Sequence, residues 1–214
     1  MRYNPNEAIS QTAKKLFDVQ DYSYVKLDHL NELEITNFSN MKPVMNFLKL
    51  LLSKSSMLKK VRVVINGVML HELPASLDHL KHLHLEICLM EQDEISSALC
   101  MIRSSPVLKK IVFKMYNKKL PVRRTPNNFL DLENYSDLKL DHLETLEIEM
   151  FSKSPLVMDF VKLVMAKAPV LKKVRIQLRG GVSVDEELKM LRSLVLLPFR
   201  RASPYAKLVV ERYN

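Results

Sequence analysis

The apolar positions of the chain follow a pattern that occurs three times. Units of 39 residues span 27–65, 77–115 and 140–178, align without a gap, and each opens with Leu-Asp-His-Leu. Within each unit, apolar residues first alternate with polar ones, then recur every three or four residues, and finally alternate again. Alternation is typical of a strand and the wider spacing of a helix, so each unit predicts a strand, a helix and a second strand.

The predicted strands and helices each present one apolar face. Successive side chains of an extended chain point to opposite sides, so the opening strands bury Leu33, Ile35, Leu83, Leu85, Leu146 and Ile148 together. Ser154-Pro155 predicts the start of the third helix, and Pro106 and Pro169 end the second and third helices. The three helices have inward stripes at helical spacing, made of Val44, Phe47, Leu48, Leu51 and Leu52, then Ile95, Ala98, Met101 and Ile102, and finally Val157, Phe160, Val161, Val164 and Met165.

The closing strands at 58–63, 108–113 and 171–176 have the same pattern of apolar positions as the opening ones. Six strand patterns therefore begin at Leu30, Leu58, Leu80, Leu108, Leu143 and Leu171, at spacings of 28, 22, 28, 35 and 28 residues. Leucine-rich repeats are about 20 to 29 residues long, and an insertion accounts for the longest spacing. We expect an α/β fold: a leucine-rich-repeat-like solenoid of parallel strands, with helices on its convex side.

A further helix and strand are predicted after the third unit. Arg179-Gly180-Gly181 indicates a turn. Residues 184–197 then have a helical period, with Ser183 as the cap, acidic residues in the first turn, and Pro198 at the end. Residues 206–211 predict a strand, which we expect to cap the open end of the sheet.

Composition narrows the class of protein. The 214 residues are 47% hydrophobic, enough for a continuous core, and only three are glycine, so phosphate-cradling loops are not expected. The longest apolar run, Leu194 to Phe199, is too short to span a membrane, and we expect an intracellular protein, cytoplasmic or nuclear. Cys88 and Cys100 are too few for a disulfide framework and are expected to be buried. The net charge of +9 is spread over 33 basic and 24 acidic residues, so nucleic-acid binding is an unfavoured alternative.

No catalytic, metal or cofactor site is expected. Asp28-His29, Asp78-His79 and Asp141-His142 pair an acid with an imidazole, but a catalytic site is needed once, whereas every repeat needs a turn. We therefore interpret these pairs as turns and the chain as a non-enzyme. His82 and His84 lack a third ligand at zinc spacing. Lysine pairs at Lys59-Lys60, Lys109-Lys110 and Lys172-Lys173 follow the predicted helices, where their charge complements the helix C-termini.

Outward positions of the predicted sheet form two rows of polar residues. The rows are Glu34, Arg62, His84, Val112, Glu147 and Arg175, and Thr36, Val64, Glu86, Lys114, Glu149 and Gln177. Two interpretations stay open: cross-strand ion pairs on a solvated sheet, or a concave surface that recognises a protein or peptide. In the second case the predicted contacts are Glu34, Arg62, His84, Glu86, Lys114, Glu147, Glu149 and Arg175. The insertion at 116–137 offers a possible basic loop contact through Lys118, Lys119, Arg123 and Arg124, although such loops are more often simply solvated.

The C-terminal part resembles the FBD domain of plant F-box/FBD/leucine-rich-repeat proteins. The matching pieces, in order between Leu140 and Glu211, are LETLEIEMF, a helix leading into APVLKKVRI, an acidic EELKML helix, and RRASPYAKLVV. The units upstream resemble the leucine-rich repeats of the same family. We therefore divide the chain into an N-terminal segment at 1–24, a leucine-rich-repeat region at 25–136, and an FBD domain at 137–214 that continues the solenoid.

The resemblance implies a non-catalytic protein-interaction module that recognises the substrate of an F-box-type (SCF) ubiquitin ligase. Such proteins usually begin with an F-box, and no segment here matches its Leu-Pro and Trp pattern. The chain is interpreted either as a fragment of a longer product or as a shortened relative. The alternative function is a stand-alone or decoy binding protein that recruits no ligase; binding of the ligase adaptor is expected only with an F-box upstream.

Overall fold

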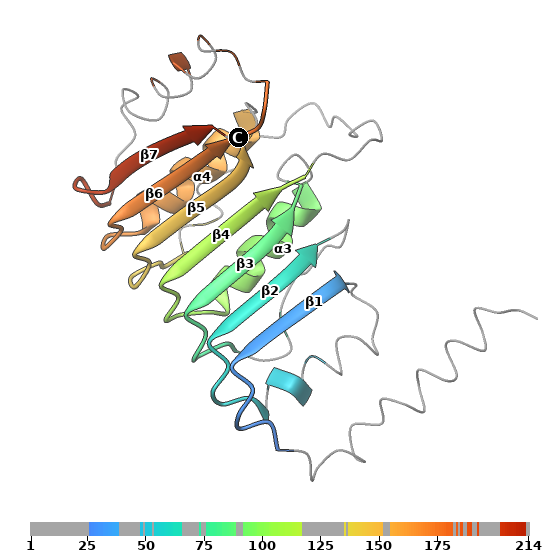
Figure 1. Ribbon diagram of the computed structural model, residues 1–214. Helices are drawn as coiled ribbons and strands as arrows, with labels where there is room; N and C mark the ends of the chain where they lie inside the picture. Colours follow the sequence, from blue (N-terminus) through green and yellow to red (C-terminus); the bar gives the residue numbers. More distant parts are fainter. Residues whose placement is uncertain are drawn as a thin grey trace, which may run out of the picture.

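The computed structural model describes residues 26–38, 54–65, 76–88, 92–116, 137–151, 155–181 and 202–212, with single positions at 48, 50–52, 73, 135, 183, 185, 188–189 and 192. These residues form a seven-stranded parallel sheet whose strands lie in chain order (Figure 1). The predicted parallel order of six strands is confirmed, and a seventh follows them. The strands are β1 (Glu32–Phe38), β2 (Lys60–Ile65), β3 (His82–Ile87), β4 (Lys110–Met115), β5 (Thr145–Phe151), β6 (Lys173–Leu178) and β7 (Lys207–Arg212).

A turn precedes each of the first six strands, and its last residue is the leucine that opens the strand pattern. In Leu-Asp-His-Leu the amide of the second leucine donates to the carbonyl of the first, at 2.9, 3.0 and 3.1 Å in the three copies. The amides of Leu58, Leu108 and Leu171 donate in the same way to the residue three earlier, at 3.2, 3.3 and 3.4 Å. Each strand therefore begins two residues after the predicted leucine, and the Asp-His pairs are turns.

The apolar face of the sheet is covered by helices α3 (Gln92–Arg103) and α4 (Pro155–Lys167), which lie behind it in Figure 1. The predicted stripes of both helices are buried, as are Cys88 and Cys100. Phe113 of β4 meets Phe160 of α4 edge to face, with ring centroids 5.0 Å apart. One core therefore runs across the predicted boundary between residues 136 and 137.

A buried carboxylate joins α3 to three strands at their C-terminal ends. Glu94 is fully buried, and its Oε2 accepts the backbone amide of Cys88 at 2.7 Å. The Tyr116 hydroxyl lies 3.0 Å from the same oxygen and 2.6 Å from the carbonyl oxygen of Ile65. Charge-assisted hydrogen bonds of this kind are stronger than neutral ones, so this contact anchors the start of α3.

Two strands shift register near their ends, at equivalent positions of the first and third units. The pairing shifts between Ile35 and Phe38 in β1 and between Ile148 and Phe151 in β5. Met150, inside the second irregularity, has a φ of 58°, which a side chain with a Cβ adopts at a cost. Pairing resumes at Phe38 and Phe151, so each irregularity is a local bend inside the strand.

Some predictions fall wholly or partly outside the described residues. The segment 1–24 and most of the 116–137 insertion, including Lys118, Lys119, Arg123 and Arg124, lie outside them. Of the predicted 184–197 helix, only positions 185, 188, 189 and 192 are described, and they are helical. The predicted final strand is confirmed as β7, which pairs in parallel with β6 at the end of the sheet.

Candidate partner-binding surface

The predicted outward residues lie on the face of the sheet opposite α3 and α4. Glu34 pairs in register with Arg62, Arg62 with His84, His84 with Val112, Val112 with Glu147, and Glu147 with Arg175. In the second row Glu86 pairs with Lys114 and Lys114 with Glu149. We call this surface the open face. It brings all eight predicted contact residues together, and β7 adds Val209 and Glu211 to the rows.

Arg62 is the centre of an ion-pair group on the open face. Its Nη2 contacts Glu86 Oε1, and its Nε lies 3.5 Å from Glu34 Oε1. Lys114 Nζ lies 3.3 Å from the same Glu86 oxygen. These two cations lower the pKa of Glu86 against the opposing effect of its partial burial, and the Glu86 hydrogen bond raises the pKa of Arg62. Both bases thus hold the Glu86 carboxylate ionised between strands β2 and β4.

Arg175 and Lys110 make the corresponding contacts toward the C-terminal strands. Arg175 donates from Nε and Nη2 to one oxygen of Glu211, at 2.9 and 2.7 Å, and this contact raises the pKa of Arg175 and lowers that of Glu211. Lys110 Nζ lies 2.8 Å from Glu147 Oε1. All these side chains are partly solvent-exposed, so each ion pair contributes little to stability, and a charged group of a partner can replace either member of the pair.

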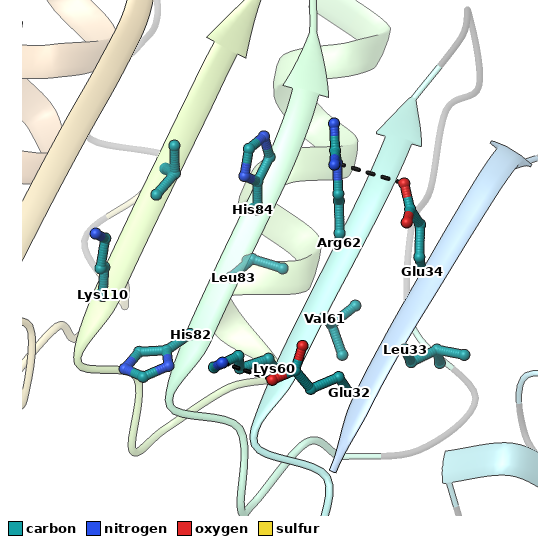
Figure 2. Close-up of a pocket in the computed structure, with 11 residues that line it drawn as sticks. Glu32, Leu33, Glu34, Lys60, Val61, Arg62, His82, Leu83, His84 and Lys110 are labelled. Carbon is teal, nitrogen blue, oxygen red and sulfur yellow. Dashed lines mark hydrogen bonds and ion pairs between the residues drawn. The ribbon is translucent and has the colours of Figure 1, made fainter. Parts of the chain in front are cut away.

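A hollow of about 620 Å³ lies on the open face over β1 to β4. Figure 2 shows Arg62 and His84 at its upper part and Glu32, Lys60, His82 and Lys110 at its lower part, on neighbouring strands. The volume is within the range of sites that bind small molecules or single side chains, about 300–1,000 Å³. The hollow is therefore the part of the open face best shaped to receive a projecting side chain.

The two histidines of the hollow are held in their neutral form. Partial burial lowers the pKa of His84, and the adjacent guanidinium of Arg62 lowers it further. Burial also lowers the pKa of His82, together with Lys60 and Lys110. His84 Nε2 is buried without a hydrogen-bond partner among the described residues. A neutral imidazole can donate or accept, so His84 is suited to a polar group of a bound partner.

A third outward row, nearer the start of the strands, was missed by the sequence prediction. It contains Glu32, Lys60, His82, Lys110, Thr145, Lys173 and Lys207, which pair with one another in register. The signal was present, because these residues lie two positions before the first predicted row and so point to the same side. They were overlooked because the strand patterns were counted from the leucines inside the turns.

The part of the chain that the structure describes contains no group of three or more His, Cys, Asp or Glu side chains arranged to hold a metal ion. Across the same residues, none of the helices has the length and apolar character needed to cross a membrane.

Comparison with known proteins identifies relatives of this arrangement. The FBD family model matches residues 140–176, which include β5, α4 and part of β6. An F-box/FBD/LRR-repeat protein of Arabidopsis thaliana is 29% identical over 139 residues, which are 64% of this chain and 32% of the relative. The chain is similar to the F-box/FBD/LRR-repeat proteins. The predicted resemblance is thus confirmed, and the chain spans about a third of the length of that curated relative.

The segment that matches the FBD family model can be located in the sheet. It begins at Leu140, the first residue of the third Leu-Asp-His-Leu turn, and ends at Ile176 inside β6. Of the predicted contacts, Glu147, Glu149 and Arg175 therefore belong to the FBD segment, and the others lie upstream of it. No solved structure matches the chain.

Proposed function

We propose that this chain is the target-recognition module of an F-box-type ubiquitin ligase receptor, folded as a leucine-rich-repeat solenoid that binds a protein on its open face. The observation that carries the proposal is the set of register-aligned charged rows on the face that α3 and α4 leave uncovered. Solenoids commonly bind partners on such extended surfaces. The relation to F-box/FBD/LRR-repeat proteins supports the ligase context.

The physical basis is a surface whose charges are in place before binding. The carboxylate of Glu86 is held between two bases, and Arg175 is held by Glu211, so few rotamers remain to be ordered when a partner arrives. Charge complementarity of this kind gives specificity and fast association more than affinity. The hollow over β1 to β4 adds a recess in which one partner side chain is desolvated, and such recesses hold the strongest contacts of interfaces.

The test is capture of proteins from plant cells by the chain and by the double variant Arg62→Glu/Arg175→Glu. We expect the variant to lose a specific partner while its melting midpoint stays within about 4 °C of the parent, since exposed ion pairs contribute little. The double variant Arg62→Gln/Arg175→Gln removes the same two positive charges without adding a carboxylate beside Glu34 and Glu86. Loss of the partner in this variant too shows that the arginines themselves are needed for recognition. The matched control Arg179→Glu/Arg192→Glu reverses two exposed charges elsewhere and should keep the partner.

Two outcomes would contradict parts of the proposal. If the partner is retained by both double variants but lost on substitutions at Lys118, Lys119, Arg123 and Arg124, the insertion is the recognition element instead of the open face. If a partner is captured without cullin and adaptor when the chain is expressed with its natural upstream sequence, the protein is a stand-alone or decoy binder outside the ligase.

A further inference from the structure

Three lysine pairs open alternate strands of the sheet. Lys59-Lys60, Lys109-Lys110 and Lys172-Lys173 stand at the starts of β2, β4 and β6. In each pair both backbone amides donate to one carbonyl of the preceding strand's start, that of Asn31, Lys81 or Glu144, at 2.9 to 3.2 Å. These hydrogen bonds fix the position of each lysine pair, and the strand order puts the pairs at the N-terminal ends of every second strand, along one side of the sheet. We call this row of strand ends the lysine edge.

The turns along the lysine edge alternate in the same way. Before β1, β3 and β5 the exposed turn tips are an acid and an imidazole, whereas before β2, β4 and β6 each tip ends in an apolar residue. Met57 and Val170, two of these apolar residues, are each 44% exposed. The two kinds of turn tip therefore alternate along the lysine edge. In strand order they are Asp28-His29, Ser56-Met57, Asp78-His79, Pro106-Val107, Asp141-His142 and Pro169-Val170.

The six lysines of the pairs have more positive charge than the three glutamates that they contact, while Asp28, Asp78 and Asp141 lie at the turn tips of the same edge. Lys60 pairs with Glu32 at 2.5 Å and Lys110 with Glu147 at 2.8 Å, and Glu144 lies 2.7 Å from Lys172 and 3.8 Å from Lys109. Lys59 and Lys173 have no ion-pair partner among the described residues.

The lysines of this edge act on a neighbouring imidazole. Burial is the main cause that lowers the pKa of His82, which lies between two of the pairs, and Lys60, Lys110 and Lys81 lower it further. The paired lysines are 38–70% exposed, so an incoming carboxylate can reach them and replace a weak internal partner.

Spacing defines the ligand that fits. Neighbouring strands lie about 4.8 Å apart, so the pairs repeat about every 10 Å. A peptide in the polyproline II conformation advances about 3.1 Å per residue and completes one turn in three residues, so every third side chain points to the same side at about that distance. The geometry points to the lysine edge as a second binding site, which takes an extended acidic segment of a protein with a carboxylate at every third residue. Small or apolar residues between the carboxylates would lie against the exposed tips.

The acid tips favour a peptide over a nucleic acid. A nucleic acid has a phosphate at every nucleotide, so some of its charges would meet Asp78 and Asp141 between the lysine pairs. A peptide can place uncharged residues there. Single strands also bind by stacking bases on aromatic side chains. The described turn tips of this edge have the imidazoles of His29, His79 and His142 and the phenol of Tyr205, but each imidazole stands beside an aspartate that repels phosphate, and Tyr205 precedes β7, outside the lysine pairs.

Fluorescence anisotropy with labelled synthetic peptides tests this site. Three peptides of identical composition have three glutamates at every third position, at every second position, or in one block. Each exposed contact changes affinity by a few-fold, so the every-third peptide should bind the native chain roughly tenfold more tightly than the block peptide. The triple variant Lys59→Gln/Lys109→Gln/Lys172→Gln should lose this preference, and its melting curve should remain that of the parent.

A matched control removes the same charge elsewhere. Arg179→Gln/Lys189→Gln/Arg192→Gln neutralises three exposed bases away from the lysine edge and should keep the preference. The proposal is overturned if the three peptides bind equally or do not bind, or if both triple variants lose affinity alike. Tighter binding of a single-stranded oligonucleotide than of the every-third peptide would assign the edge to nucleic acid instead. Lys60 and Lys110 also line the hollow, so the open-face variant used here is Arg62→Gln/Arg175→Gln, which leaves all six lysines in place and should keep the preference for the every-third peptide; failure of this site is thereby distinguished from failure of the proposed function.

Discussion

The contact between Phe113 and Phe160 tests whether the repeat region and the FBD segment unfold together. Phe113 belongs to β4 and Phe160 to α4, on opposite sides of the predicted boundary between residues 136 and 137. Both side chains are fully buried, and their rings meet at 82° with centroids 5.0 Å apart. If the two regions share one core, weakening this contact destabilises the whole sheet in a single transition.

The expected magnitude follows from burial and geometry. Truncating a buried phenylalanine to alanine costs about 3–5 kcal/mol, so Phe113→Ala should lower the melting midpoint by roughly 10 °C in a chain of this length. The edge-to-face pair contributes about 0.5–1.5 kcal/mol beyond burial. That part is measured by a double-mutant cycle of Phe113→Leu and Phe160→Leu, in which leucine keeps most of the apolar volume.

Urea unfolding followed by circular dichroism gives the free energies for the cycle. Phe113→Leu combined with Val61→Ala is the control, because Val61 lies two strands away, about 10 Å or more, and the two effects should add. A coupling energy near zero for the two phenylalanines would refute the aromatic contribution. Two separate transitions in Phe113→Ala, one of them unaffected, would refute the shared core.

Three further predictions concern the core, the buried carboxylate and the histidine of the hollow. Leu83→Ala should cost about 2–5 kcal/mol, and Leu33→Ala clearly less, because Leu33 in edge strand β1 is only partly buried; equal losses in urea would contradict this. Glu94→Ala should cost about 1–3 kcal/mol by leaving the amide of Cys88 unpaired, and Glu94→Gln should lose less. The lowered pKa of His84 means that the unfolded chain takes up its proton first, so stability should fall as pH falls below about 6.5, and His84→Gln should flatten that slope in thermal melts.

The strand order and the outward rows could be predicted because both follow from a periodic sequence. The alternation that places Leu83 and Leu85 inward also places His84 outward, and the repeat alignment matched Glu34 with Arg62 before any pairing was known. The start of each strand was placed two residues too early, because the opening leucine is held by the turn and cannot join the sheet. The leucine is apolar like the inward strand residues that follow it, so the sequence pattern alone does not reveal that its backbone amide is bonded within the turn.

Other features depend on information that periodicity does not contain. Arg62 contacts Glu86, which is diagonal to it across the sheet, as well as its row neighbour Glu34, because a long side chain can choose between several acids. The hollow results from the relative sizes of side chains on four strands, which no single strand pattern describes. The positive φ of Met150 and the register shift around it are likewise not visible in the alternation of apolar and polar residues.

The strict chain order of the strands has a consequence for how the protein folds. Every strand pairs only with the strands immediately before and after it in the sequence, so each pairing closes a loop of only about 22 to 35 residues. Among the described strands, none pairs with a strand from a distant part of the sequence. We expect folding to start where a helix buries its apolar stripe completely, as α4 does behind β5 and β6 (Figure 1). From that nucleus the sheet can grow one strand at a time in both directions, as in other linear arrays.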